Sequence, residues 1–229
     1  MKHLYVVVHP EATHHITKVV GGWYDTTLTE KGLNQADRIG YHLRSIIPPN
    51  ARVHIHSSDL QRCAVAAKHI AQSLGGIPVN ETTDLRELAY GEAEGKPEAW
   101  LEGRYRFPPA SPAVPSLRDE EAMRVRLDHD FGIKGAETRR QCGERVYRAM
   151  ERDVFPLFGD GTGDVYQVVV THGFAMVMVV AAWIGMPLDA ADAISIASRK
   201  GSITVLQEDD VYHNRCIVSV NEMGHLTDV

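Results

Sequence analysis

Three short β-branched runs of the sequence each lead into a side chain that can carry chemistry. The runs and the side chains that follow them are 4–8 with His9, 52–56 with Arg62, and 164–171 with His172. Histidine is a common acid–base group near neutral pH, and arginine binds anions through a planar fork of donors. Ligands of open α/β sheets bind at the carboxyl ends of strands. We therefore predict that the three side chains converge on one pocket.

Strands and helices alternate along the chain. Besides the three runs, we expect a short extended piece from Pro78 and late strands at 202–207 and 216–221. Expected helices follow Thr29, run from Ser57-Ser58-Asp59 as N-cap to Leu74, and cover 137–155 and 173–185. This alternation predicts an α/β fold, a three-layer sandwich with a mostly parallel central sheet flanked by helices.

Composition excludes several classes of protein. The 229 residues carry 24 basic and 30 acidic side chains, a net charge of −6, so nothing favours a nucleic acid or a membrane as partner. The longest apolar run, 174–184, is shorter than the ~20 residues that span a bilayer. Three widely spaced cysteines without a CxxC pair indicate reduced thiols, and we expect a cytoplasmic protein.

The segment from about 96 to 135 interrupts the regular pattern with five prolines and many charges. Long irregular segments inside a compact domain are usually functional. We interpret this one as a cap-like insertion that covers the pocket, within a single domain spanning 1–229.

Several blocks together resemble the histidine phosphatase (phosphoglycerate mutase-like) superfamily. They stand in the family's order and cover nearly the whole chain: Val8-His9-Pro10-Glu11-Ala12, Gly22 to Gly32, Ser57 to Ala64, Leu85 to Gly91, Gly135 to Thr138, Val170 to Gly173, and Ser202 to Thr204. Each block is weak by itself, and their combination is specific.

The resemblance implies phosphoryl transfer through a phosphohistidine. His9 would be the nucleophile, while Arg62 and His172 would hold the phosphoryl oxygens. Glu87 would protonate the leaving alcohol and then activate water. The substrate-binding residues that the resemblance implies are Gly21, Gly22, Gly173 and Arg86. It implies no cofactor, and His14-His15 with Glu11 does not form a familiar ligand spacing, so we expect no metal.

The first block departs from the family pattern, because Val8 and Pro10 replace the Arg and Gly that flank the family's nucleophile. Loss of one strong donor from such a site typically lowers the rate ~10²–10³-fold. Candidates for the missing charge are His14, His15, Lys18, Arg86, Arg104 and Arg106.

Three functions stay open at this point. A phosphatase acting on a small phosphorylated metabolite is the preferred one. A phosphoglycerate mutase-type phosphotransferase is second, because Phe174 stands where mutases carry Asn. A family member with lost or altered activity is third, on account of Val8. The apolar late helix and the edge strands could support a homodimer.

Overall fold

A six-stranded sheet forms the centre of the molecule, as a computed structural model describes it for residues 1–107, 120–159, 163–191 and 193–227. Its strands, in the spatial order β3-β2-β4-β1-β5-β6, are β3 (Val79–Thr82), β2 (Arg52–Ser58), β4 (Val165–Thr171), β1 (Lys2–Val8), β5 (Ile203–Glu208) and β6 (Arg215–Glu222). The first four run parallel, whereas β5 and β6 pair antiparallel. The mostly parallel sheet is therefore confirmed.

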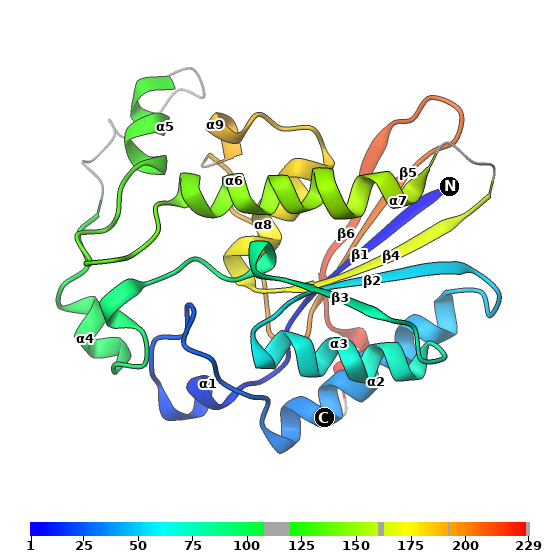
Figure 1. The fold of residues 1–229 in the computed structure, drawn as a ribbon, viewed down its shortest axis with the longest axis horizontal. Helices are drawn as coiled ribbons and strands as arrows, with labels where there is room; N and C mark the ends of the chain where they lie inside the picture. Colours follow the sequence, from blue (N-terminus) through cyan, green and yellow to red (C-terminus); the bar gives the residue numbers. More distant parts are fainter. Residues whose placement is uncertain (108–119, 160–162, 192, 228–229) are drawn as a thin grey trace.

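Helices cover both faces of this sheet (Figure 1). The longer ones are α2 (Glu30–Ile46) and α3 (Gln61–Ser73) on one face, and α6 (Arg139–Ala149) and α8 (Gly173–Trp183) on the other. Side chains of a strand alternate between faces. Accordingly, Tyr5 and Val7 pack toward α2 and α3, while Leu4 and Val6 pack toward α6 and α8. The three-layer sandwich is confirmed.

Shorter elements complete the described fold. They are α1 (Thr13–Thr17), α4 (Glu98–Glu102), α5 (Glu120–Leu127), a π-helical turn (Met150–Val154), α7 (Phe155–Phe158), α9 (Leu188–Ala191) and three 3₁₀ turns (Thr83–Leu85, Gly91–Ala93, Gly224–Leu226). The expected helix 137–155 is thus α6, the π turn and the start of α7. No helix in the described ranges is both long and apolar enough to cross a membrane.

The expected insertion contains α4 and α5, while 108–119 lies outside the described residues. Two of its aromatic side chains pack inward, because the ring centroids of Tyr105 and Phe131 are 4.8 Å apart and Phe131 belongs to the core, whereas Phe107 is exposed. Glu98 and Leu101 of α4 line the cavity described below. The described part of the insertion therefore contributes a wall to that cavity.

The N-terminus of α3 differs from the sequence expectation. Its N-cap is Leu60, which offers no side-chain cap. Asp25, from a distant loop, accepts hydrogen bonds from the Gln61 backbone N–H at 2.8 Å and from the Gln61 side-chain Nε2 at 3.1 Å. Ser57 and Ser58 instead extend β2 and are buried. The predicted Ser57-Ser58-Asp59 cap was wrong, because a tertiary contact satisfies the helix end.

Gly32 generates a stability prediction. A Cβ at this position would overlap the carbonyl oxygen of Glu11. That carbonyl also accepts from the Thr29 N–H at 3.0 Å, which ties the start of α2 to the loop after His9. We expect Gly32→Ala to lower the free energy of unfolding by about 1–3 kcal/mol through overpacking.

Chemical denaturation of the two variants Gly32→Ala and Gly224→Ala measures this. Gly224 is the matched control, because a Cβ added to it would meet no other atom within 4 Å. Equal stabilities of the two variants would contradict the steric argument.

Candidate active site

Parallel pairing of β1 with β4 places the two strand-end histidines together. The register aligns Val8 with Thr171, and the His9 N–H donates to the Thr171 carbonyl at 2.9 Å. The chain leaves both strands at the same edge, so the ring centroids of His9 and His172 lie 5.1 Å apart in an edge-on arrangement. The two strand-end histidines of the predicted site therefore lie next to each other.

His9 is held in one tautomer. Its Nδ1 lies 2.8 Å from the Pro10 carbonyl oxygen, and a carbonyl can only accept, so the proton is on Nδ1. Burial, and then the charge of Arg62, lowers the pKa of His9 well below 6.5. The imidazole is therefore neutral at pH 7, and its Nε2 carries a lone pair, as a nucleophile requires.

Arg62 presents a charged donor group from the first turn of α3. The side chain is 1% exposed, and its guanidinium donates to the carbonyls of Gly22 at 2.6 Å and Tyr24 at 3.0 Å. Its Nε–H finds no partner among the described residues. Because an unpaired buried donor is costly, this N–H favours binding of an acceptor such as a phosphoryl oxygen.

The ring of His172 packs against that of His9. It is fully buried, its Nε2 is 2.9 Å from Ser58 Oγ and 3.3 Å from Cys63 Sγ, and burial with the charge of Arg62 lowers its pKa well below 6.5. His172 is not part of the cavity surface, unlike His9 and Arg62. Direct contact of His172 with a phosphoryl group stays a prediction from the resemblance.

Glu87 lines the cavity and faces the N-terminus of α8. Its carboxylate accepts from the backbone N–H groups of Leu88 at 2.8 Å, Phe174 at 3.1 Å and Ala175 at 3.3 Å. These donors orient the carboxylate beside Gly173, where an added Cβ would lie 3.6 Å from Glu87 Oε2.

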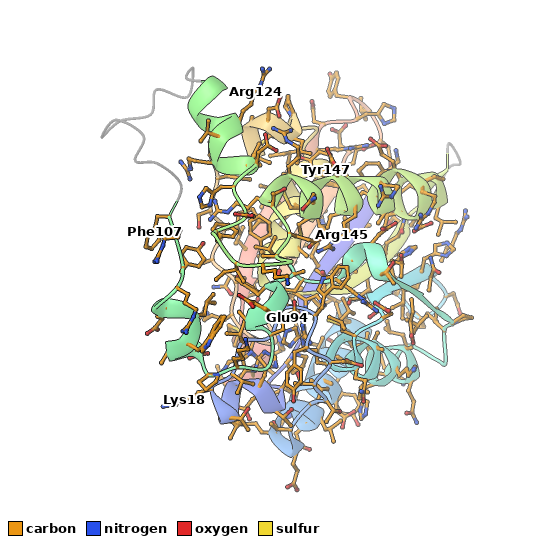
Figure 2. The ribbon with its side chains drawn as sticks, turned by 60° about the vertical axis from the view of Figure 1, so that its left-hand side comes forward. Lys18, Glu94, Phe107, Arg124, Arg145 and Tyr147 are labelled. Carbon is orange, nitrogen blue, oxygen red and sulfur yellow. The ribbon has the colours of Figure 1, made fainter. Side chains whose placement is uncertain are left out.

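Arg145 of α6 holds the segment that carries Glu87 in place, a role that sequence reasoning missed. Its guanidinium donates to the carbonyl of Glu87 at 2.6 Å and to that of Asp84 at 3.1 Å, and it pairs with Glu137 at 2.7 Å. Arg145 thereby projects from α6 into the interior (Figure 2). Glu137, expected to begin the helix, serves this ion pair, while Thr138 caps α6.

The glycines predicted to bind substrate, Gly21, Gly22 and Gly173, all line the cavity. A Cβ on Gly21 would approach His14 Nε2 to 3.1 Å, and Gly22 has a φ of +57°, which favours glycine. Arg86 lies elsewhere: its guanidinium is paired with Asp59 and stacks over the Trp23 ring at 4.9 Å. Arg86 is not part of the cavity lining, so its geometry does not favour the predicted substrate contact.

His14 and His15 enclose one side of His9. Ligand atoms of His9, His14 and His15 all lie within 4.8 Å of one another, a cluster that could hold a metal ion and that the sequence spacing did not reveal. The His15 Nδ1, however, accepts the Ala12 backbone N–H at 3.0 Å, so the ring proton sits on Nε2. A proton on Nε2 suits donation to an anion better than ligation of a metal.

The cavity between these groups has a volume of about 340 Å³. Two of its lining residues, Ser198 and Lys200, come from the segment before β5 and were not foreseen. Among the sequence candidates for the missing charge, His14 and His15 line the cavity. Lys18, Arg86, Arg104 and Arg106 are not part of its lining, and Lys18 lies at the periphery of the molecule (Figure 2).

The family of this chain follows from comparison with known sequences. The family model of the histidine phosphatase superfamily (branch 1) matches residues 4–218, so the chain belongs to this superfamily. A probable phosphoglycerate mutase from Salmonella paratyphi C is 28% identical over 191 residues, which are 82% of this chain and 77% of the relative. A broad-specificity phosphatase from Saccharomyces cerevisiae is 33% identical over 99 residues, 40% of each chain.

Solved structures show the same fold. A mycobacterial glucosyl-3-phosphoglycerate phosphatase superposes with a TM-score of 0.71 at 22% identity, covering 97% of this chain and 100% of that one. A phosphoserine phosphatase from Entamoeba histolytica superposes with a TM-score of 0.68 at 17% identity, covering 99% of this chain and 100% of that one. At these identities the likeness concerns the fold.

The neutral histidine cluster generates a prediction about acid stability. Burial, and then repulsion from His15 once it is protonated and from the charges of Arg62 and Lys200, lowers the pKa of His14 from 6.5 to about 3. Between pH 6.5 and 3 the unfolded chain binds a proton at this residue that the folded protein does not. Stability is therefore lost as pH falls below 6.5, by at most about 1.4 kcal/mol per pH unit for each such histidine.

We expect His14→Gln to lose less stability than the parent between pH 7 and pH 4.5, measured by urea denaturation. Gln72→Ala, at an exposed residue of α3 that carries no ionisable group, is the control and should follow the parent. An unchanged pH slope in His14→Gln would contradict a neutral His14 in the folded protein.

Proposed function

We propose that this protein is a phosphomonoester hydrolase that acts on a small phosphorylated metabolite through a phosphohistidine on His9. The observation that carries the proposal is the fixed, neutral tautomer of His9, whose Nε2 is free of the Pro10 hydrogen bond. His9 shares its cavity with Arg62 and Glu87, an anion-binding group and a proton carrier. The cavity volume also suits a small ligand.

The proposed reaction has two phosphoryl transfers. In the first, His9 Nε2 forms a bond to phosphorus while the ester oxygen departs with a proton from protonated Glu87. Glu87 is then ionised, and in the second transfer it takes a proton from water as the water oxygen attacks phosphorus. The bond to Nε2 breaks, and orthophosphate leaves. Arg62 stabilises the charge on the non-bridging oxygens in both transfers.

A phosphoglycerate mutase-type transferase is the second candidate, supported by the relative from Salmonella paratyphi C. A mutase substrate carries a second anionic group, such as a carboxylate, and its binding would need further cationic side chains near the site. Among the described residues that line the cavity, Arg62 and Lys200 are the cationic ones. Phe174, which follows Gly173, donates only its backbone N–H to Glu87. Hydrolysis is therefore the preferred reaction.

Phosphate release from a panel of small phosphomonoesters tests the proposal. We expect His9→Ala to reduce release to background, because no other group replaces the nucleophile. Glu87→Gln should lower kcat about 10²–10⁴-fold, the usual contribution of a general acid. His213→Gln is the control, and it should keep the parent rate.

A covalent phosphoenzyme, detected by mass spectrometry after rapid acid-free quenching, should form in Glu87→Gln and be absent from His9→Ala. Release that persists in His9→Ala would contradict the phosphohistidine. Phosphoryl transfer to a second alcohol without free phosphate would instead support the mutase. A parent without turnover or phosphoenzyme would mean that the chain has lost this activity.

A further inference from the structure

The position before the nucleophile has no charge in this protein. Val8 is 4% exposed and packs in the core cluster on the α6 and α8 side of the sheet, although it also borders the cavity. Phosphoryl transfer is catalysed mainly by positioning and charge stabilisation. Arg62 is one cationic group of the cavity, and two of its donors are occupied by the backbone carbonyls of Gly22 and Tyr24.

A tight turn before β5 is hydrogen-bonded to Val8 itself. The Ser202 N–H donates to the Arg199 carbonyl at 3.0 Å, which closes a four-residue turn. Gly201, at the third position of this turn, has a φ of +77°, a backbone conformation that residues other than glycine rarely adopt. Its N–H donates to the Val8 carbonyl at 3.0 Å, and the Val8 N–H donates to the Ser202 carbonyl at 3.0 Å.

Lys200 is the second residue of this turn. The backbone bonds on either side of it therefore fix its Cα next to the end of β1, and Lys200 lines the cavity together with His9 and Arg62. Within the described ranges, its ammonium group has no carboxylate at ion-pair distance, in contrast to the guanidinium of Arg86, which pairs with Asp59.

The positive charge of Lys200 contributes to lowering the pKa of the neighbouring His14 and His15. Burial, followed by the charges of Lys200 and Arg62, lowers the pKa of His15 from 6.5 to about 4. His15 is thereby neutral at pH 7, and with Nδ1 accepting from the Ala12 N–H, its Nε2–H is a donor. The positive charges of Arg62 and Lys200 beside this neutral donor favour an anion in the cavity over a metal cation.

We propose that Lys200 supplies the positive charge that is missing at Val8, by contacting the non-bridging oxygens of the phosphoryl group on His9. This inference rests on the proposed function and deepens it. An ammonium group acts as a point charge and lacks the planar fork of a guanidinium. The site therefore binds a tetrahedral oxyanion through Arg62 on one side and Lys200 on the other, with the turn 199–202 as the positioning device.

Binding of orthovanadate, measured by calorimetry on the full chain, tests Lys200 without requiring turnover. We expect Lys200→Met to weaken binding more than about tenfold, because a charged contact to the oxyanion is lost. Lys200→Arg should restore binding to within a few fold of the parent. Arg199→Met is the matched control: it removes a positive charge from the same turn, but Arg199 contacts Asn221 and is not in the cavity lining.

Phosphate release completes the test. We expect Lys200→Met to lower kcat/KM about 10²-fold, and the double variant Val8→Arg/Lys200→Met to regain much of the loss. Thermal unfolding first establishes that the double variant is folded, because Val8 is buried. If the double variant does not fold, the role of Lys200 is judged from the vanadate affinity and kcat/KM of Lys200→Met, compared with those of Lys200→Arg and Arg199→Met.

Equal vanadate affinity in Lys200→Met and Arg199→Met would overturn the role of Lys200, as would a parent that does not bind vanadate. The proposed function fails by a separate result, namely phosphate release that does not depend on His9. Vanadate binding that depends on Lys200 in a protein without turnover would retain the oxyanion site and reject the hydrolase.

Discussion

Parallel pairing of β1 with β4 is the constraint that sets the geometry of the site. It aligns Val8 with Thr171, so the residues that follow, His9 and His172, leave the sheet side by side. Both strands are buried on their two faces, and a slip of one residue would reverse every side chain between the two cores. The same hydrophobic packing that stabilises the sheet therefore sets the separation of the two imidazoles.

Charge in the cavity is organised by burial as much as by charged residues. Arg62 is buried, and its Nε–H has no partner among the residues that the structure describes. Burial of His9, and then the positive charge of Arg62, lowers the pKa of His9 and keeps its imidazole neutral. The Pro10 carbonyl then selects the tautomer with a free Nε2. Pro10 departs from the family pattern, yet its carbonyl provides the acceptor for the Nδ1–H of His9. Because this acceptor is a backbone carbonyl, the replacement of glycine by proline at position 10 leaves it in place.

Glu87 depends on contacts from three distant parts of the chain. The N–H groups at the start of α8 orient its carboxylate, and the Trp23 indole N–H donates to its backbone carbonyl at 2.7 Å. Arg145, neutralised by Glu137, holds the same carbonyl from α6. The carboxylate thus belongs to a short irregular segment whose backbone is held in place by the side chains of Trp23 and Arg145.

Apolar periodicity is a local signal, and it was enough to predict the strands, most helix boundaries, and His9, Arg62 and His172 as candidate residues near strand ends. Glu87 became a candidate only through the resemblance to the superfamily. Contacts between remote parts of the chain leave no such signal. Asp25 caps α3, and Arg145 positions Glu87, through contacts that exist only in the folded protein. Lys200 reaches the end of β1 because β5 pairs antiparallel with β1, and no motif around Lys200 reveals that pairing.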